Sequence, residues 1–297
     1  MVPCRHVDHL PTYIFPEPVN QPTYSSSQGQ NQLEMTVKTY AILGATGQTG
    51  SEIVQALLPT KAHLNIYARS LTRLQSRFPS IQSAPNVTLF IGDLSNAELL
   101  ASCLSNADVV LSSVAQNRNE PGLSVAQQTA LAIIKALEPR RLGPKTLPTV
   151  VFLSSGAVMP DKNAEQNNTF AQRLVHWCIY WVYTDLEKSF ELFEANPWVP
   201  VTIAAASALV HGTEHDVKLV DDKEAASLII SYTDLAKGMI MMGNEGERWH
   251  GKHVAMWVNG GKKISGNPAA LLRYLLPNLL AMVCPPLWWL FESYWPR

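Results

Sequence analysis

The sequence carries little charge, and the charge that it carries does not favour one sign. Charged residues make up 16% of the 297 residues, with 23 basic and 24 acidic side chains and a formal net charge of −1. Binding to the phosphates of nucleic acid requires a basic surface, which this balance does not supply. Apolar residues make up 46% of the chain, enough to bury a sizeable core. We therefore expect a globular protein without a nucleic-acid partner.

Cysteine is also scarce. The chain has four cysteines that lie far apart, and no two of them form a C-x-x-C pair. This spacing matches neither a redox motif nor a zinc site. Isolated thiols of this kind are typical of buried cysteines in a reducing compartment, which favours the cytoplasm.

The first 34 residues lack the features of a folded element and of a secretory signal. Residues 2–31 are rich in Pro, Ser, Gln and Asn and have no hydrophobic period. They contain no apolar stretch of about 7–15 residues behind a basic start, so a secretory signal is excluded. We predict that residues 1–34 form a disordered extension or result from an early start codon, with Met35 as the natural start of the folded part.

Between residues 35 and 258, short apolar runs alternate with helical patterns, as in a parallel sheet with crossover helices. We predict an α/β protein with a doubly wound Rossmann-type sheet, interleaved substrate-binding segments and a smaller C-terminal substrate-capping part. The predicted strands span residues 39–43, 64–68, 87–91, 108–113, 148–154, 201–205 and 254–258. The predicted helices span residues 49–58, 123–137 and 170–195, and two more begin at a cap on Ser95 and at residues 231–234.

The last segment, residues 259–297, is apolar and rich in Pro and Trp. It holds 18 uncharged residues between Arg273 and Glu292, which as an unbroken helix would measure ~27 Å. Three prolines interrupt this stretch, and each removes a backbone donor. We favour a flap over the substrate pocket or against the core. Interfacial membrane contact through the tryptophans is a less favoured alternative, and a membrane span is the least favoured.

A glycine-rich turn follows the first predicted strand and leads into the first predicted helix. In such a turn Gly44 permits the tight bend, Gly47 lets pyrophosphate approach the backbone, and Gly50 lets the helix pack on the strand. The helix N-terminus then offers unpaired N–H groups to the phosphates. We predict a dinucleotide site made by Gly44, Thr46, Gly47, Gln48, Thr49 and Gly50.

The end of the second strand predicts which dinucleotide binds. NAD binders place a carboxylate there for the ribose 2′-hydroxyl, whereas NADP binders place an arginine. This chain has Arg69, Ser70 and Arg73, with no carboxylate between Lys61 and Arg73. A guanidinium can hold the 2′-phosphate through two hydrogen bonds. The pattern favours NADP(H), although two ordinary solvated arginines are the alternative.

The third strand ends at Gly92, Asp93 and Leu94. At this position Asp93 can accept a hydrogen bond from the adenine amino group, with Leu94 beside it. An aspartate that only forms the turn is the competing interpretation.

These three segments together resemble the NmrA-like branch of the atypical short-chain dehydrogenase superfamily, from about residue 36 to residue 258. Residues 64–70 and 180–186 are also similar to averufin-oxidase-type proteins of fungal aromatic polyketide pathways. The resemblance implies an oxidoreductase that performs a tailoring step on an aromatic substrate, anthraquinone-like or xanthone-like.

The resemblance also implies a catalytic tyrosine, with a lysine four residues later that lowers the pKa of the phenol. Here Tyr183 is followed at that spacing by Glu187, and Tyr180 by Thr184. Lys188 lies five residues after Tyr183, about 140° around an ideal helix. We nevertheless predict Tyr183 as the proton-transfer residue, with Tyr180 as its competitor. The alternative for both tyrosines is an aromatic ring that packs in a helix interface and has no catalytic role.

Ser154 and Ser155 end the fifth strand, at the place of the superfamily's catalytic serine. The segment after the sixth strand departs from the family. Relatives read Thr-Ile-x-Arg-Pro-Gly, whereas residues 202–207 read Thr-Ile-Ala-Ala-Ala-Ser. The departures keep two other functions open: a non-catalytic NADP(H)-sensing regulatory protein, and a non-redox isomerase or cyclase on the same fold.

Residues 211–215 match the H-x-x-E-H spacing of certain zinc peptidases. That chemistry needs a stable helix, which places both imidazoles on one face. Gly212 and the position after a predicted strand indicate a loop instead. We therefore predict no metal site and leave a substrate-pocket or surface role for these histidines.

Overall fold

The computed structural model describes residues 37–160, 173, 176–212 and 214–259. The extension predicted for residues 1–34 lies outside these residues. So do residues 260–297 of the predicted flap and most of the first part of the helix predicted over residues 170–195.

Eight strands form one sheet in which every neighbouring pair is parallel except the last. They are β1 Thr39–Leu43, β2 His63–Ala68, β3 Val87–Ile91, β4 Val109–Ser112, β5 Thr149–Ser155, β6 Val201–Ala206, β8 Val217–Val220 and β10 His253–Val258. The order across the sheet is β3-β2-β1-β4-β5-β6-β10-β8, and only β8 runs antiparallel to its neighbour β10. The order reverses between β1 and β4, which is the switch point of a doubly wound fold. The predicted Rossmann-type α/β fold is confirmed.

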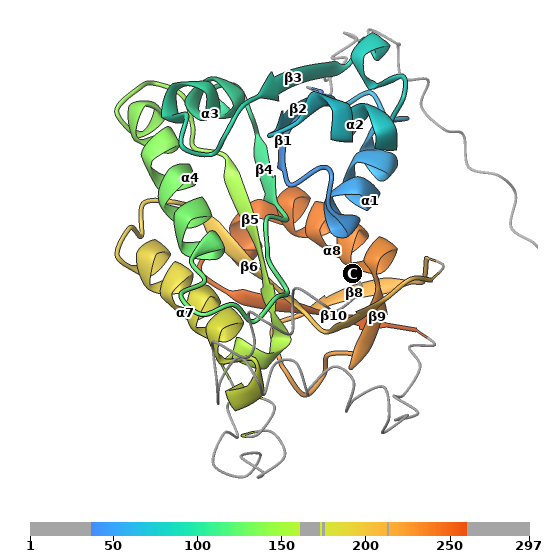
Figure 1. Cartoon of the computed structure of the whole chain (residues 1–297), viewed down its shortest axis with the longest axis vertical. Helices are drawn as coiled ribbons and strands as arrows, with labels where there is room; N and C mark the ends of the chain where they lie inside the picture. Colours follow the sequence, from blue (N-terminus) through green and yellow to red (C-terminus); the bar gives the residue numbers. More distant parts are fainter. Residues whose placement is uncertain (1–36, 161–172, 174–175, 213, 260–297) are drawn as a thin grey trace, which may run out of the picture. The chain divides into compact units, whose positions relative to one another are not determined.

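Helices cover both faces of the sheet (Figure 1). They are α1 Gln48–Leu57, α2 Leu71–Arg77, α3 Ala97–Leu104, α4 Val125–Arg141, α7 Tyr180–Glu194 and α8 Tyr232–Glu245. Helix α1 contacts α8 on one face, and α4 contacts α3 and α7 on the other. None of these helices, within the described part of the chain, has the length and hydropathy needed to cross a membrane.

The central strands are apolar on both faces because each face packs against helices. In β1, Tyr40 and Ile42 join the core beneath α1 and α8, while Ala41 and Leu43 join the core beneath α3, α4 and α7. All five residues of β1 are buried. This explains why the strand reads as a continuous apolar run and not as an alternating one.

The short elements were not predicted. Strands β7 (Ala208–Val210) and β9 (Ile229–Ser231) pair in parallel as a separate two-stranded sheet, and β8 lies at the edge of the main sheet. Three or four residues are too short to establish a hydrophobic period. Helix α2 buries only Leu74, so it too shows no apolar stripe.

The predicted cap on Ser95 is wrong by one residue. Asn96 caps α3, and its side-chain oxygen accepts a hydrogen bond from the Leu99 N–H at 3.0 Å. Ser95 instead donates its own backbone N–H to the Asp93 carboxylate at 3.0 Å. The turn formed by Asp93 therefore delays the helix start by one residue.

Candidate cofactor and substrate site

Glycine is sterically required in the turn after β1. Gly44 has φ +89°, in the region that favours glycine, and a Cβ there would lie 2.8 Å from Ser113 Oγ. A Cβ on Gly50 would lie 2.1 Å from the Gly44 carbonyl oxygen. The turn therefore depends on two glycines that bring α1 against the ends of β1 and β4.

The first turn of α1 presents its backbone donors to the space above the sheet edge. Gly47 is the N-cap, and within the described structure no side chain caps this helix. The Gly47 N–H donates to the Gly44 carbonyl at 2.9 Å, which folds the turn tightly. Thr46 and Gln48 are exposed, whereas Thr49 is buried under the turn. Uncapped N–H groups with no acidic residue in the first turn fit a phosphate.

The residues predicted to read the ribose and adenine lie at the ends of the adjacent strands β2 and β3. Arg69, Arg73 and Asp93 are exposed, and Leu94 is half-buried. Ser70 caps α2, and its hydroxyl oxygen accepts a hydrogen bond from the Arg73 N–H at 3.3 Å. All of these side chains therefore gather at the carboxyl edge of the sheet, on the side of the glycine turn.

Asp93 stabilises the turn after β3 through hydrogen bonds that do not depend on a ligand. Its carboxylate accepts from the Ser95 N–H, and its backbone carbonyl accepts from the Tyr67 hydroxyl at 2.7 Å. The hydrogen bonds from Ser95 lower the pKa of the Asp93 carboxyl, and the positive charge of Arg69 lowers it further. The carboxylate therefore stays ionised and available as an acceptor.

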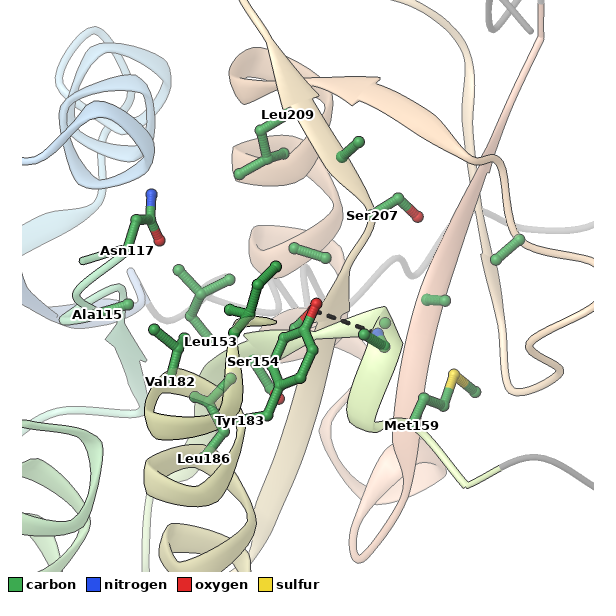
Figure 2. Close-up of a pocket in the computed structure, with 18 of the residues that line it drawn as sticks. Ala115, Asn117, Leu153, Ser154, Met159, Val182, Tyr183, Leu186, Ser207 and Leu209 are labelled. Carbon is green, nitrogen blue, oxygen red and sulfur yellow. Dashed lines mark hydrogen bonds between the residues drawn. The ribbon is translucent and has the colours of Figure 1, made fainter. Parts of the chain in front are cut away.

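A pocket of about 690 Å³ opens where the carboxyl ends of β5 and β6 meet α7. Ser154 and Tyr183 both line it (Figure 2). Ser154 Oγ is buried and has no hydrogen-bond partner among the described residues. Ser155 also lines the pocket, but its hydroxyl accepts from the Ala157 N–H at 3.2 Å. The free hydroxyl of the pair is therefore that of Ser154.

The two candidate tyrosines occupy different environments. Tyr183 is 8% exposed and its ring lies 5.0 Å from that of His176. Tyr180 is 40% exposed, packs edge-on against Trp181, and is not among the described residues that line the pocket. Lys188 is exposed and also lies outside that lining. The structure thus brings Tyr183 together with Ser154 and Ser155, and it separates Tyr180 from them.

Two buried residues that the sequence did not single out hold α7 in place. The Asp185 carboxylate, on α7, accepts from the backbone N–H groups of Ala126 at 2.8 Å and Gln127 at 3.1 Å, at the start of α4. Asn119 accepts from the Trp181 N–H at 2.8 Å, at the start of α7. The partners lie 58 to 62 residues apart in the chain, so no local pattern indicates them.

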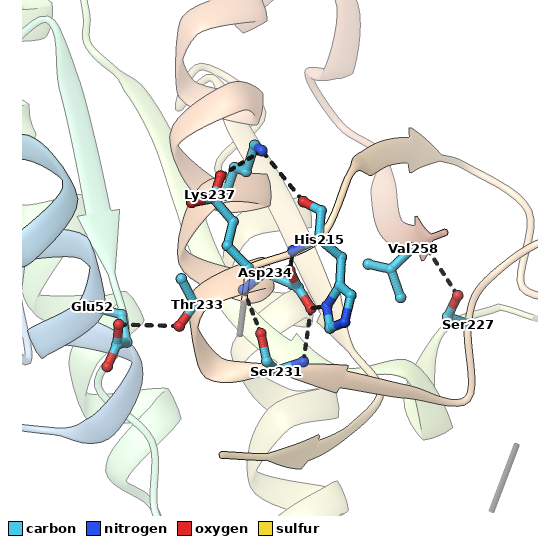
Figure 3. A network of polar contacts seen from close by, with 9 residues as sticks. Glu52, His215, Ser227, Ser231, Thr233, Asp234, Lys237 and Val258 are labelled. Carbon is cyan, nitrogen blue, oxygen red and sulfur yellow. Dashed lines mark hydrogen bonds and ion pairs between the residues drawn. The ribbon is translucent and has the colours of Figure 1, made fainter. Parts of the chain in front are cut away.

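His215, the last residue of the H-x-x-E-H segment, takes part in a polar network (Figure 3). His215 Nδ1 lies 2.8 Å from the Asp234 carboxylate, which also accepts from the His215 N–H at 2.7 Å and the Ser231 N–H at 3.1 Å. Asp234 is fully buried in the first turn of α8, where it completes a capping box with Ser231. The described residues contain no group of three or more metal-ligating side chains, although Thr213 lies outside them.

The Asp234 network predicts a pH-dependent contribution to stability. Burial raises the pKa of Asp234, but the hydrogen bonds from His215 and Ser231 outweigh it, so the pKa is lower than usual. A lowered folded-state pKa stabilises the protein above the unfolded-state pKa, and this stabilisation is lost as pH falls through the folded-state pKa. Asp234→Asn should lower the free energy of unfolding by about 1–3 kcal/mol at neutral pH.

Urea unfolding between neutral and acidic pH tests this expectation. The difference between wild type and Asp234→Asn should shrink below pH about 4, where the unfolded-state carboxyl becomes protonated. Asp221→Asn is the control, because this carboxylate is exposed and forms a surface ion pair with Lys252 at 3.5 Å. A difference that does not change with pH would contradict the assignment.

Comparison with known proteins agrees with this geometry. A family model described as NAD(P)H-binding matches residues 44–244. Oxidoreductase stcQ of Emericella nidulans is 31% identical over 263 residues, which cover 83% of this chain and 92% of that protein. Averufin oxidase A of Aspergillus flavus is 31% identical over 251 residues, which cover 80% of this chain and 88% of that protein.

Among solved structures, a short-chain dehydrogenase/reductase from Veillonella parvula in complex with NADP superposes with a TM-score of 0.56. It is 19% identical, and the match covers 77% of this chain and 99% of that one. This likeness supports the fold. Because the family model matches most of the chain and the relatives are named oxidoreductases, the chain belongs to the NAD(P)H-binding family and is an oxidoreductase.

Proposed function

We propose that the protein is an NADP(H)-dependent oxidoreductase that acts on a polycyclic phenolic compound, as a tailoring step on an aromatic polyketide. The observation that carries the proposal is the pocket of about 690 Å³ at the same sheet edge as the glycine turn. Its size suits a drug-sized ligand, since such pockets typically measure about 300–1,000 Å³. Two relatives that bear the name averufin oxidase, both 31% identical, support an anthraquinone-like or xanthone-like substrate.

The lining of the pocket suits a flat aromatic molecule that carries a few oxygen atoms. Leu153, Met159, Val182 and Leu186 supply apolar surface for rings. Ser154 supplies a buried hydroxyl without a partner among the described residues. A carbonyl or phenol oxygen of the substrate would satisfy that hydroxyl, which otherwise costs about 1–3 kcal/mol as an unpaired buried group.

Four polar residues then have distinct roles. NADPH, when bound, supplies the hydride. Ser154 orients the substrate oxygen through a hydrogen bond. Tyr183 exchanges a proton with that oxygen, because its ring lines the same pocket from α7. Asp185 and Asn119 position Tyr183 by fixing α7 against α4 and the loop that precedes it.

The preference for NADP(H) over NAD(H) rests on Arg69 and Arg73. Arg69→Ala should weaken NADPH binding by about 1.5–3 kcal/mol, the contribution of a hydrogen bond to a charged group. This corresponds to roughly 10- to 150-fold in Kd. NADH binding should not change, because NADH lacks the 2′-phosphate. Titration of nucleotide fluorescence measures both affinities.

Arg141→Ala is the matched control for that titration. Arg141 is an exposed arginine near the end of α4, in a surface pair with Glu138 at 3.6 Å. It should leave both affinities unchanged. An equal loss for NADPH and NADH in Arg69→Ala would show that the arginine does not recognise the 2′-phosphate.

The oxidoreductase function is tested by the absorbance of NADPH in the presence of hydroxylated anthraquinones and xanthones. The proposal predicts oxidation of NADPH with one of these compounds, or reduction of NADP⁺ with its reduced form. Chromatography of the same mixtures identifies the product. Conversion of a substrate without any change in the nucleotide would instead establish a non-redox isomerase or cyclase.

A further inference from the structure

A second cavity, of about 370 Å³, lies at the opposite edge of the sheet from the substrate pocket. Val201, the first residue of β6, lines this cavity, whereas Ala206, the last, lines the substrate pocket. Six strand residues separate the two openings by roughly 17 Å. The second cavity is therefore a separate site, and the proposed reaction does not use it.

Two histidines and Glu194 supply the polar side chains that line this cavity. His250 Nε2 and His253 Nδ1 are both buried, and neither has a hydrogen-bond partner among the described residues. Their loop is pinned to the neighbouring strand, because the Gly251 N–H donates to Val201 at 2.7 Å and Lys252 accepts from Ile203 at 2.9 Å. The backbone between the two histidines is thus fixed, and each ring leaves one buried nitrogen atom without a partner among the described residues.

Burial favours the neutral form of both imidazoles. Burial lowers the pKa of His253, and burial lowers the pKa of His250 more than the charge of Glu247 raises it. A neutral imidazole offers one donor and one acceptor. A hydroxyl group is itself both a donor and an acceptor. It can therefore form a hydrogen bond with either tautomer of the neutral ring.

The walls other than the two histidines and Glu194 are aromatic and aliphatic. Phe190 and Phe193 line the cavity from α7, and Trp198 lines it from the loop after that helix. The ring of Phe190 stands edge-on to that of His253, with centroids 4.9 Å apart. Such walls favour a flat apolar ligand. The described residues hold no cluster of three metal-ligating groups, so these histidines alone do not make a metal site.

We propose that this cavity binds a small phenol of one or two fused rings, with its hydroxyl hydrogen-bonded to His253 Nδ1. His250 lies beside it as a second partner for the same hydroxyl or for another on the ring. The site is independent of the nucleotide and of the substrate pocket. Helix α7 lines both cavities, through Leu186 in one and Phe190 in the other, so the ligand contacts the helix that carries Tyr183.

The test uses 2-naphthol as the probe and naphthalene as its match without a hydroxyl, each added to the full chain. 2-Naphthol should bind wild type at least about tenfold more tightly than it binds His253→Phe, because the variant lacks the acceptor. Naphthalene should bind the two proteins alike. Ser154→Ala, in the substrate pocket, should leave the effect of His253 unchanged.

Imidazole nitrogen spectra locate the bound probe. 2-Naphthol should shift the His253 resonances of the wild-type chain, assigned by comparison with a His253→Gln sample. If His253→Phe has the nucleotide affinity of wild type in the fluorescence titration, the variant is folded. If that variant does not fold, the wild-type spectra alone decide. Equal 2-naphthol affinity in wild type and a folded variant, or an unmoved His253 resonance under saturating probe, would overturn the proposal.

Discussion

Replacing Tyr183 with phenylalanine should lower turnover by about 10²–10⁴-fold, the usual contribution of a positioned proton donor. The substitution keeps the ring, which is 8% exposed and packed in the core beneath α4 and α7, and removes only the hydroxyl. Folding and nucleotide affinity should therefore match wild type. Steady-state rates with the phenolic substrate and NADPH, together with a melting curve, make the measurement.

Tyr180→Phe is the matched control for this result. Both tyrosines lie on α7, but Tyr180 is 40% exposed and lies outside the described lining of the pocket. Its loss should change turnover by less than about twofold, as for most surface substitutions. Full turnover in Tyr183→Phe alongside a loss in Tyr180→Phe would transfer the assignment to Tyr180. Full turnover in both variants would exclude proton transfer by either tyrosine.

Gly50→Ala should weaken nucleotide binding and destabilise the fold. The added Cβ would lie 2.1 Å from the Gly44 carbonyl oxygen and 2.6 Å from its carbon, and neither backbone atom can rotate away. Helix α1 must then move off β1, and its N–H groups no longer point at a phosphate. We expect a loss of about 1–3 kcal/mol in stability, typical of overpacking, and more than tenfold in NADPH affinity.

Gly143→Ala serves as the control for Gly50→Ala. A Cβ at Gly143 would meet its nearest atom, the Pro139 carbonyl oxygen, at 3.5 Å, which is ordinary contact. Its melting temperature and nucleotide affinity should match wild type. Normal NADPH binding in Gly50→Ala would mean that α1 can shift without disturbing the phosphate turn.

The elements that were predicted best from the sequence are those whose local hydrophobic or capping pattern is long enough to be recognised. Strands Thr39–Leu43 and Val87–Ile91 have the predicted boundaries, because their apolar runs end abruptly at turn residues. Helix α8 begins within the predicted residues 231–234, where the structure shows a capping box between Ser231 and Asp234. The three-residue strands β7 and β9 carry no such pattern and were missed.

The candidate site divides in a similar way. The glycine turn is a contiguous motif, so its residues were predicted from spacing alone. The separation of Tyr183 from Tyr180 depends on how α7 is rotated against the sheet, which sequence spacing does not fix. Asp185 and the paired histidines of the second cavity were missed because their surroundings come from distant parts of the chain.

The contacts of Asn119 and Asp185 make helices α4 and α7 depend on each other. Asn119, just before α4, accepts from the first N–H groups of α7, and Asp185, within α7, accepts from the first N–H groups of α4. Neither helix has its initial turn satisfied until the other is docked. The pair therefore folds and opens as one cooperative unit, and its amide hydrogens should exchange with solvent at a common rate.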